Sequence, residues 1–137
     1  MPKQKRAGGA TINLLQFTDC HLTRQPDGEL LGVNTRESLS AVTDLAKRNI
    51  AAQIHQNPDL ILATGDLAQD ASEEAYTFFK SHIDDFGCPV NWFPGNHDDL
   101  SVMQKVVGEG GELNKVVQLG DWQFVLLDSL VQGAVHG

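Results

Sequence analysis

The sequence has few cysteines, few basic residues and no long hydrophobic run, and each scarcity excludes a class of protein. Cys20 and Cys88 are the only cysteines among 137 residues and form no CxxC pair, so neither a disulfide framework nor a zinc knuckle is expected. Ten Lys and Arg residues against eighteen Asp and Glu residues give a net charge of −8. Duplex nucleic acid and anionic membrane surfaces are not expected as partners, because basic residues must neutralise their phosphates.

The first residues do not resemble a targeting segment. Basic residues 1–6 lead into Ala7–Ala10 rather than into an apolar stretch, and no apolar run approaches the ~20 residues of a membrane-spanning helix. We therefore expect neither a secretory signal nor a membrane anchor, and the reducing cytoplasm is the expected compartment. Residues 1–10 are expected to be a disordered tail, and residues 11–137 one compact unit.

Short apolar stretches alternate with helical patterns along the chain. Buried strands are expected at 12–17, 60–63 and 90–93, because each is a short apolar run bounded by polar or turn-forming residues. Helices are expected from about Ser72 to Asp85 and at Leu100–Val107. A hairpin is expected from residues 115–119 and 123–127, joined through Gly120-Asp121.

The first helix carries the clearest start and stop signals. Asn34 followed three residues later by Glu37 is a capping-box pattern. Pro58 ends the helical pattern, because proline forces its predecessor out of the helical region. Apolar residues recur every three or four positions between these limits and predict one buried stripe: Leu39, Val42, Ala46, Ile50 and Ile54.

The elements follow the order β-α-β-α-β, then a short helix, then a β-hairpin. This alternation predicts an α/β fold with parallel strand pairs and helical crossovers. In such sheets, ligand chemistry gathers outside the carboxyl ends of the strands. The polar residues that follow the three strands are therefore the candidates for a functional site.

Metal-binding residue types follow all three predicted strands. Asp19 and His21 follow the first strand, Asp66 the second, and Asn96–Asp98 the third. Carboxylate, amide and imidazole donors suit manganese, iron and zinc rather than metals that prefer thiolates. Alternate residues of an extended segment point the same way, so Asp19 and His21 could bind one ion while Cys20 faces away as small buried filler.

The three motifs differ in how strongly each one, taken alone, indicates a metal site. Asp-x-His is expected by chance in roughly one chain in five of this length, and Gly-Asp in about half, so Asp19 could cap a turn and Gly65-Asp66 could be an ordinary loop. Gly-Asn-His-Asp is expected in only about one chain in a few thousand. Their occurrence in this order, each just after a predicted strand, indicates a metal site.

These motifs resemble those of the calcineurin-like metallophosphoesterases, which hydrolyse phosphate esters with two metal ions. The resemblance implies β-sheet layers flanked by helices, and it is narrower for the bacterial branch that hydrolyses 3′,5′-cyclic AMP. It runs from residue 11 to the last residue and is carried by these stretches: Leu30–Thr35, Ala63–Asp70, Trp92–Asp98, Leu126–Ser129 and His136-Gly137. Of these, Leu30–Thr35 and Asp70 are expected to border the substrate pocket.

The resemblance implies a role for each site residue. In the family, the residues matching Asp19 and His21 hold one metal ion, the one matching Asp66 bridges both ions, and the one matching Asn96 holds the second. His97 matches a catalytic histidine that is not a ligand and stands over the leaving-group oxygen. Asn96 and His97 are therefore also expected to contact the substrate.

The implied chemistry agrees with the residue types. A shared carboxylate can hold two cations ~3.5–4 Å apart, and such a pair clamps a phosphate and activates water. Protonated His97 could stabilise the developing alkoxide or donate a proton to it. Asp98 could assist catalysis by orienting His97, or Asp98 or Asp99 could instead cap the next helix. Iron and manganese are the expected cofactors, and zinc is a further candidate.

The sequence departs from the family in one respect. Family members continue into a second half with further histidine ligands, including a Gly-His-x-His motif that is absent here. His136 matches a loop histidine and not one of these ligands. Residues 11–137 are therefore expected to be the N-terminal half of the domain. Half of a sheet sandwich would expose apolar surface and strand edges, so a homo-oligomer with weak or absent activity is expected.

Three hypotheses about function remain open. The first is a two-metal phosphodiesterase acting on 3′,5′-cyclic nucleotides. The second is a metallophosphoesterase with another phosphoester substrate, since the shared motifs bind metal and phosphate and do not recognise a nucleobase. The third is a non-catalytic fragment that folds by oligomerising.

Overall fold

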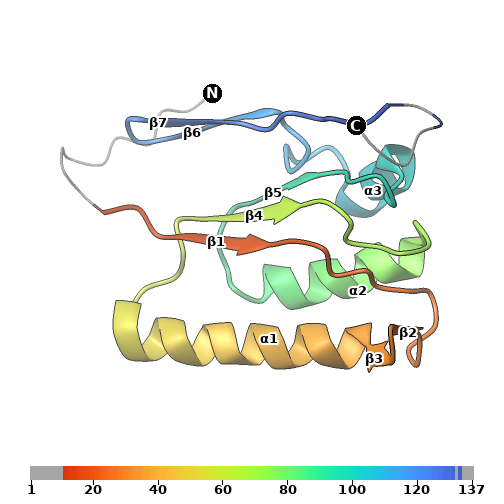
Figure 1. Ribbon diagram of the computed structural model, residues 1–137. Coiled ribbons are helices and arrows are strands. Elements are labelled where there is room, and N and C mark those ends of the chain that lie inside the picture. Colours follow the sequence, from red (N-terminus) through yellow and green to blue (C-terminus); the bar gives the residue numbers. More distant parts are fainter. Residues whose placement is uncertain (1–10, 132, 134–137) are drawn as a thin grey trace.

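The computed structural model describes residues 11–131 and residue 133 of the chain (Figure 1). The predicted tail at residues 1–10 and the loop histidine His136 lie outside the described residues. Within them, strands and helices alternate in the predicted order around a parallel sheet. The chain therefore has the α/β architecture that the sequence indicates.

The central sheet of the described residues has three parallel strands in the order β1-β4-β5. They are β1 (Leu14–Phe17), β4 (Leu60–Thr64) and β5 (Val90–Phe93). The strands predicted at 60–63 and 90–93 are confirmed, whereas β1 is shorter than the predicted 12–17. Asn13 instead pairs with the loop before β4: its amide donates to the Asp59 carboxylate at 2.9 Å, and its carbonyl accepts from the Asp59 amide at 2.8 Å.

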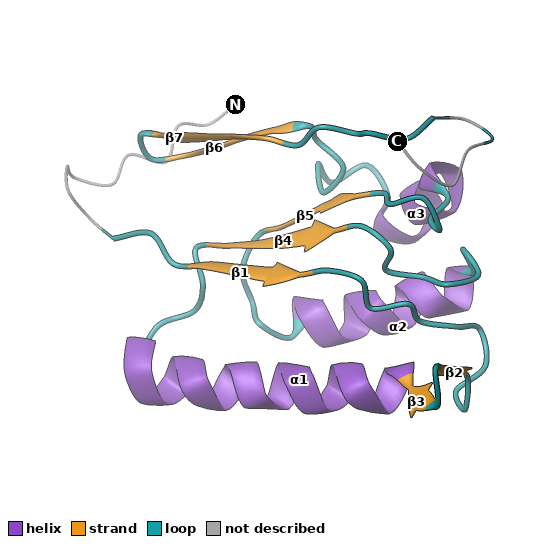
Figure 2. Ribbon diagram, viewed as in Figure 1, coloured by secondary structure: helices purple, strands orange, loops and turns teal. Residues whose placement is uncertain are grey.

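Two long amphipathic segments cover one face of this sheet (Figure 2). They are α1 (Thr35–Asn49), extended by the π-helical turn η1 (Ile50–Ile54), and α2 (Glu73–Asp84). The predicted cap of α1 is confirmed, because the Asn34 side chain accepts from the Glu37 amide at 3.0 Å. The caps set where each helix starts and therefore which side chains meet the sheet.

The buried stripe of α1 differs from the predicted one. Leu39 is buried and Ala46 and Ile50 pack against the core, but Val42 is 49% exposed and Thr43 takes the core position. The buried Thr43 hydroxyl donates to the Ser40 carbonyl at 2.9 Å, which satisfies a polar group inside the core. An apolar pattern cannot identify a core position that a polar residue occupies.

Ile54 is the second residue of the predicted stripe that does not reach the core. It lies at the end of η1 and is partly exposed. The wider π-helical turn changes the angular phase of the helix. The next residue, His55, ends the helix in the left-handed conformation with φ 57°, and the chain then leads into β4.

Aromatic side chains fill the space between the sheet and α2. Trp92 of β5 meets Phe79 of α2 edge to face with ring centroids 4.9 Å apart, and Phe17 of β1 meets the same ring at 6.4 Å. Tyr76 and Ile83 complete the buried side of α2. Such aromatic pairs contribute ~0.5–1.5 kcal/mol each beyond the area that they bury.

Two hairpins and a short helix complete the described fold. The predicted helix α3 (Leu100–Val107) is confirmed, as is the predicted hairpin, whose strands are β6 (Val116–Leu119) and β7 (Trp122–Val125). Figure 1 shows this hairpin on the side of the sheet away from α1 and α2. A smaller hairpin, β2 (Glu29–Leu30) with β3 (Val33–Asn34), precedes α1 and was not expected. None of the described helices combines the length and apolar content needed to cross a membrane.

Candidate metal centre

The loops that leave the three strands are joined by backbone hydrogen bonds. Beyond β1 and β4, the Asp19 amide donates to the Gly65 carbonyl at 3.0 Å and the His21 amide donates to the Asp66 carbonyl at 2.9 Å. The third loop joins them where the His97 amide donates to Asp66 Oδ1 at 3.0 Å. The loops carrying the predicted ligands therefore meet at the carboxyl edge of the sheet, as the topology predicts.

Three of the predicted ligands have left-handed backbone conformations. Asp19, His21 and Asp66 have φ values of 56°, 46° and 48°. Non-glycine residues in this region cost of order 1–3 kcal/mol each and persist only where the surroundings enforce them. The expectation of an extended Asp19–His21 segment is therefore wrong. Their side chains share a side because the backbone is kinked at both residues.

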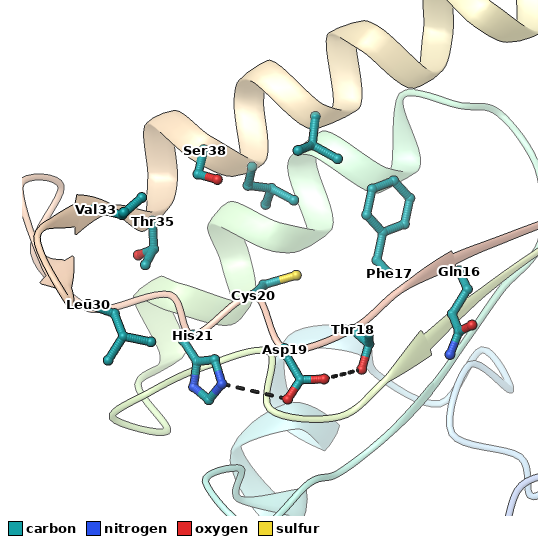
Figure 3. Close-up of a pocket in the computed structure, with 12 residues that line it drawn as sticks. Gln16, Phe17, Thr18, Asp19, Cys20, His21, Leu30, Val33, Thr35 and Ser38 are labelled. Atoms are coloured by element: carbon teal, nitrogen blue, oxygen red, sulfur yellow. Dashed lines mark hydrogen bonds and ion pairs between the residues drawn. The ribbon is translucent and has the colours of Figure 1, made fainter.

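The side chains of this first loop divide between two directions (Figure 3). Asp19 and His21 point toward each other, with Asp19 Oδ1 and His21 Nε2 3.7 Å apart, while Cys20 points toward α1. Burial raises the pKa of the Cys20 thiol to about 12. The thiol is therefore protonated near pH 7, and Cys20 is half-buried against the core rather than fully buried as predicted.

Glycines allow the second and third loops to approach one another. A Cβ on Gly95 would collide with the Asp66 carboxylate and lie 2.5 Å from the Asp66 backbone nitrogen. A Cβ on Gly65 would lie 2.8 Å from the Gly95 nitrogen, and Gly65 also has a φ of 93°. Close contact between the two loops thus requires glycine at both positions, and the positive φ of Gly65 favours glycine as well.

Two imidazoles and one carboxylate converge in this centre. Ligand atoms of His21, Asp66 and His97 all lie within 4.8 Å of one another, and the two imidazole ring centroids are 5.3 Å apart. Asp19 adjoins the group through its contact with His21. Such a donor set fits manganese, iron or zinc. The geometry gives His97 a position from which it can bind a metal, whereas the resemblance implied a catalytic, substrate-contacting residue that is not a ligand.

Asn96 lies in the exposed turn directly before His97. Asn96 is therefore adjacent in sequence to a member of the group formed by His21, Asp66 and His97. This position leaves the Asn96 amide accessible from solvent, whereas Asp66 is held between the loops by its backbone and carboxylate bonds.

Asp98 is half-buried between the same loops. Its carboxylate accepts from the amides of Gly95 at 2.8 Å, Ala68 at 3.1 Å and Leu67 at 3.3 Å, and from the Tyr76 hydroxyl at 2.9 Å. Burial raises the pKa of Asp98 above its usual range. These partners tie the second loop to the third and to α2, and the His97 imidazole is not among them.

The helix cap that the sequence left open between two residues belongs to Asp99. Its carboxylate accepts from the amides of Ser101 at 2.8 Å and Val102 at 3.1 Å, at the start of α3. Neighbouring carboxyl groups thus have separate tasks: Asp98 joins the loops, and Asp99 starts the helix.

Sequence reasoning missed two residues that contact predicted ligands. The Thr18 hydroxyl donates to Asp19 Oδ2 at 2.6 Å (Figure 3), and the second contact is made by Gln69. The Gln69 side-chain oxygen lies 2.8 Å from His21 Nδ1. Gln69 belongs to the Ala63–Asp70 stretch, so the resemblance drew attention to its neighbourhood but assigned it no role. Its neighbour Asp70, expected beside the substrate pocket, accepts from the Arg24 amide at 2.8 Å and the Ser72 amide at 3.1 Å.

A cavity of about 380 Å³ adjoins the centre between β1, the β2–β3 hairpin and the start of α1 (Figure 3). Asp19 and His21 line it together with Leu30, Val33 and Thr35. Part of the Leu30–Thr35 stretch thus lies next to the candidate ligands. The apolar and hydroxyl side chains of this stretch offer a surface for the uncharged part of a ligand. The candidate metal centre beside them suits the charged part of the same ligand.

Comparison with known proteins agrees with this geometry. Residues 12–133 match the family described as calcineurin-like phosphoesterase. Over 134 residues the chain is 46% identical to the 3′,5′-cyclic adenosine monophosphate phosphodiesterase CpdA of Escherichia coli (strain K12), a match that covers 96% of this chain and 46% of that protein.

Two further relatives show how far the similarity extends. CpdA of Pseudomonas aeruginosa is 39% identical over 131 residues, covering 96% of this chain and 46% of that protein. The 3′,5′-cyclic-nucleotide phosphodiesterase alr5338 of Nostoc sp. (strain PCC 7120) is 34% identical over 127 residues, covering 92% of this chain and 46% of that protein. The chain thus spans about half the length of these relatives.

Proposed function

Because the chain belongs to the calcineurin-like phosphoesterase family, we propose that it forms part of a metal-dependent phosphodiesterase that hydrolyses 3′,5′-cyclic AMP. The observation that carries this proposal is the convergence of His21, Asp66 and His97 within 4.8 Å at the carboxyl edge of the sheet. Relatives named as cyclic AMP phosphodiesterases match this chain over 96% of its length, which favours a cyclic nucleotide over other phosphoesters.

In this proposal each ligand keeps the role that the family resemblance implies. Asp19 and His21 would hold one metal ion, Asp66 would be shared between two ions, and Asn96 would hold the second. Iron or manganese fits these oxygen and imidazole donors, and zinc is a further candidate. When bound, two such ions offset the charge of a phosphate substrate and activate a water for in-line attack. They also allow a chain with net charge −8 to bind an anion.

His97 contacts the substrate and acts on its leaving-group oxygen. Its backbone amide is fixed to Asp66 Oδ1 at 3.0 Å, so the imidazole is held next to the shared carboxylate. A protonated imidazole at this position donates a proton to the departing oxygen. Asp98 supports this step indirectly, because it fixes the backbone of the loops that carry Asp66 and His97.

We propose further that the isolated chain associates as a homo-oligomer with weak or absent turnover. Apolar side chains stay exposed on the side of the sheet away from the helices, including Leu14, Trp122 and Val125. At ~25 cal/mol per Å² of apolar area, covering several hundred Å² would contribute on the order of 10 kcal/mol. Sedimentation should show a dimer or larger species, and a stable monomer would contradict this expectation.

The expected compartment is the cytoplasm. Cys20 and Cys88 are both free thiols, which a reducing compartment preserves. The acidic net charge of −8 also makes duplex nucleic acid and anionic membrane surfaces poor partners.

The function can be tested with the chain itself. Bound manganese is measured by elemental analysis after dialysis, and hydrolysis of cyclic AMP is compared with that of an aryl phosphodiester. Metal binding with slow, chelator-sensitive hydrolysis of cyclic AMP supports the proposal. Metal-dependent hydrolysis of the aryl ester alone would favour a different phosphoester substrate. Absence of both metal binding and turnover would favour the non-catalytic fragment.

A further inference from the structure

The two ring nitrogens of His21 face different partners. Nδ1 lies 2.8 Å from the side-chain oxygen of Gln69, while Nε2 lies 3.7 Å from Asp19 Oδ1 and faces the candidate centre. The first distance is that of a direct hydrogen bond, and the second is too long for one. Gln69 is therefore the residue that bonds directly to the His21 ring on the side away from the centre.

The backbone holds Gln69 in place for this contact. The Gln69 amide donates to the Leu22 carbonyl at 2.7 Å, and the Leu22 amide donates to the Leu67 carbonyl at 2.9 Å. Leu22, Leu67 and Ala68 are completely buried. The segments bearing His21 and Gln69 are thus anchored to one another and to the core, so the side-chain contact is set by the fold.

The chemistry of imidazole gives the contact a consequence. A neutral imidazole carries one N–H and one lone pair, and a metal ion requires the lone pair. If His21 binds through Nε2, then Nδ1 must carry the proton and needs an acceptor. The Gln69 amide oxygen is such an acceptor, and it adds no further negative charge beside Asp19 and Asp66.

We propose that Gln69 is a positioning residue that selects the Nδ1–H tautomer of His21 and so presents the Nε2 lone pair to the metal. The inference rests on the proposed function, because it takes His21 as a metal ligand. A reversed Gln69 amide would have the opposite effect: its NH₂ group would donate to Nδ1, and the proton would move to Nε2 and block the ligand. The tautomer of the metal-free chain distinguishes these two arrangements.

The first measurement is the pair of ¹⁵N chemical shifts of the His21 imidazole in the metal-free chain, at alkaline pH where the ring is neutral. The expected result is a protonated Nδ1 in the unmodified chain and in Gln69→Glu, which retains a carbonyl-type acceptor. In Gln69→Met, which has nearly the same size but no strong acceptor, the Nε2–H form should gain population. A protonated Nε2 in the unmodified chain would overturn the proposal, whatever the metal affinity.

The second measurement is manganese affinity by calorimetry. Gln69→Met should weaken binding by ~10–100-fold, the loss typical of an outer hydrogen-bond partner, and Gln69→Glu should restore most of it. The matched control is Gln118→Met, which should leave manganese affinity unchanged. It also removes a glutamine side-chain hydrogen bond, since the Gln118 amide donates to the Gly120 carbonyl at 2.8 Å, but it does so in the β6–β7 hairpin. Equal manganese affinity in Gln69→Met and the unmodified chain would overturn the proposal. If the unmodified chain binds no manganese, the proposed function fails in this chain, while the ¹⁵N shifts still decide the role of Gln69.

Discussion

The two sides of the central sheet differ in how completely they are covered. On the side of α1 and α2, Ile61 and Phe79 are fully buried and Trp92 is only 2% exposed. On the other side, Leu14 of β1 is 45% exposed, and Trp122 in the β6–β7 hairpin is 63% exposed. One side is therefore a closed core, and the other keeps large apolar side chains in contact with solvent.

The metal-centre loops depend on the covered side. The first two loops bury Leu22, Leu67 and Ala68 completely, and Asp98 of the third loop bonds to Tyr76, which α2 holds in the core. This packing and the hydrogen bonds between the loops enforce the left-handed backbone conformation of Asp19 and Asp66. The candidate ligands His21, Asp66 and His97 are thus held together by the loops while the opposite side of the sheet stays open.

The largest expected effect comes from removing the shared ligand on the anchored side. Asp66→Ala should abolish binding of at least one metal ion, because a single carboxylate serves both ions in the proposed site. Circular dichroism should still show a folded chain, since the side chain contributes no core area. Elemental analysis that finds unchanged metal content would contradict the bridging role.

The next effect separates catalysis from metal binding in the third loop. In whichever assembly is active, His97→Ala should lower turnover by ~10²–10⁴-fold if His97 is a general acid. The loss should be smaller for an aryl ester with a good leaving group, because such a group needs less protonation. If His97 is instead a ligand, as its position within 4.8 Å of His21 and Asp66 allows, metal content will fall as well.

A pair of tryptophan variants tests the comparison directly. Trp92→Ala should lower the free energy of unfolding by ~3–5 kcal/mol, because it removes a buried ring that packs against Phe79. Trp122→Ala should change it by ~0.5 kcal/mol or less, because its ring is largely exposed. Denaturant titrations of both variants below the association concentration measure the difference. Equal losses would contradict the difference in burial between the two sides.

The smallest effect concerns close approach between loops. Gly95→Ala should cost ~1–3 kcal/mol, since its Cβ meets the Asp66 backbone and carboxylate, and should also weaken manganese binding. Gly120→Ala, in the β6–β7 turn, has open space around the new Cβ but a φ of 59°, so it should cost ~1 kcal/mol of stability and leave metal affinity unchanged. Calorimetry on both variants checks the prediction, and an unchanged manganese affinity in Gly95→Ala would contradict it.

Periodicity and caps predicted the elements that pack by simple rules. β4, β5 and α3 occur where apolar runs and turn signals place them, and Asn34 caps α1 as its spacing from Glu37 predicts. The β2–β3 hairpin escaped prediction because its strands have only two residues each and its tight turn depends on left-handed Leu31 and Gly32. Leu31 shows no sequence signal for that conformation.

The amino-acid sequence by itself determined which chemical groups follow each strand and that parallel strands would bring them to one edge. Only the tertiary structure decided how those groups are presented. Three features arise between segments far apart in the chain: the kinked backbone at Asp19 and His21, the contact of Gln69 with His21, and the bonds by which Asp98 joins the loops. Local patterns encode propensity and periodicity, whereas these features depend on hydrogen bonds and packing between loops, which exist only once the core has formed.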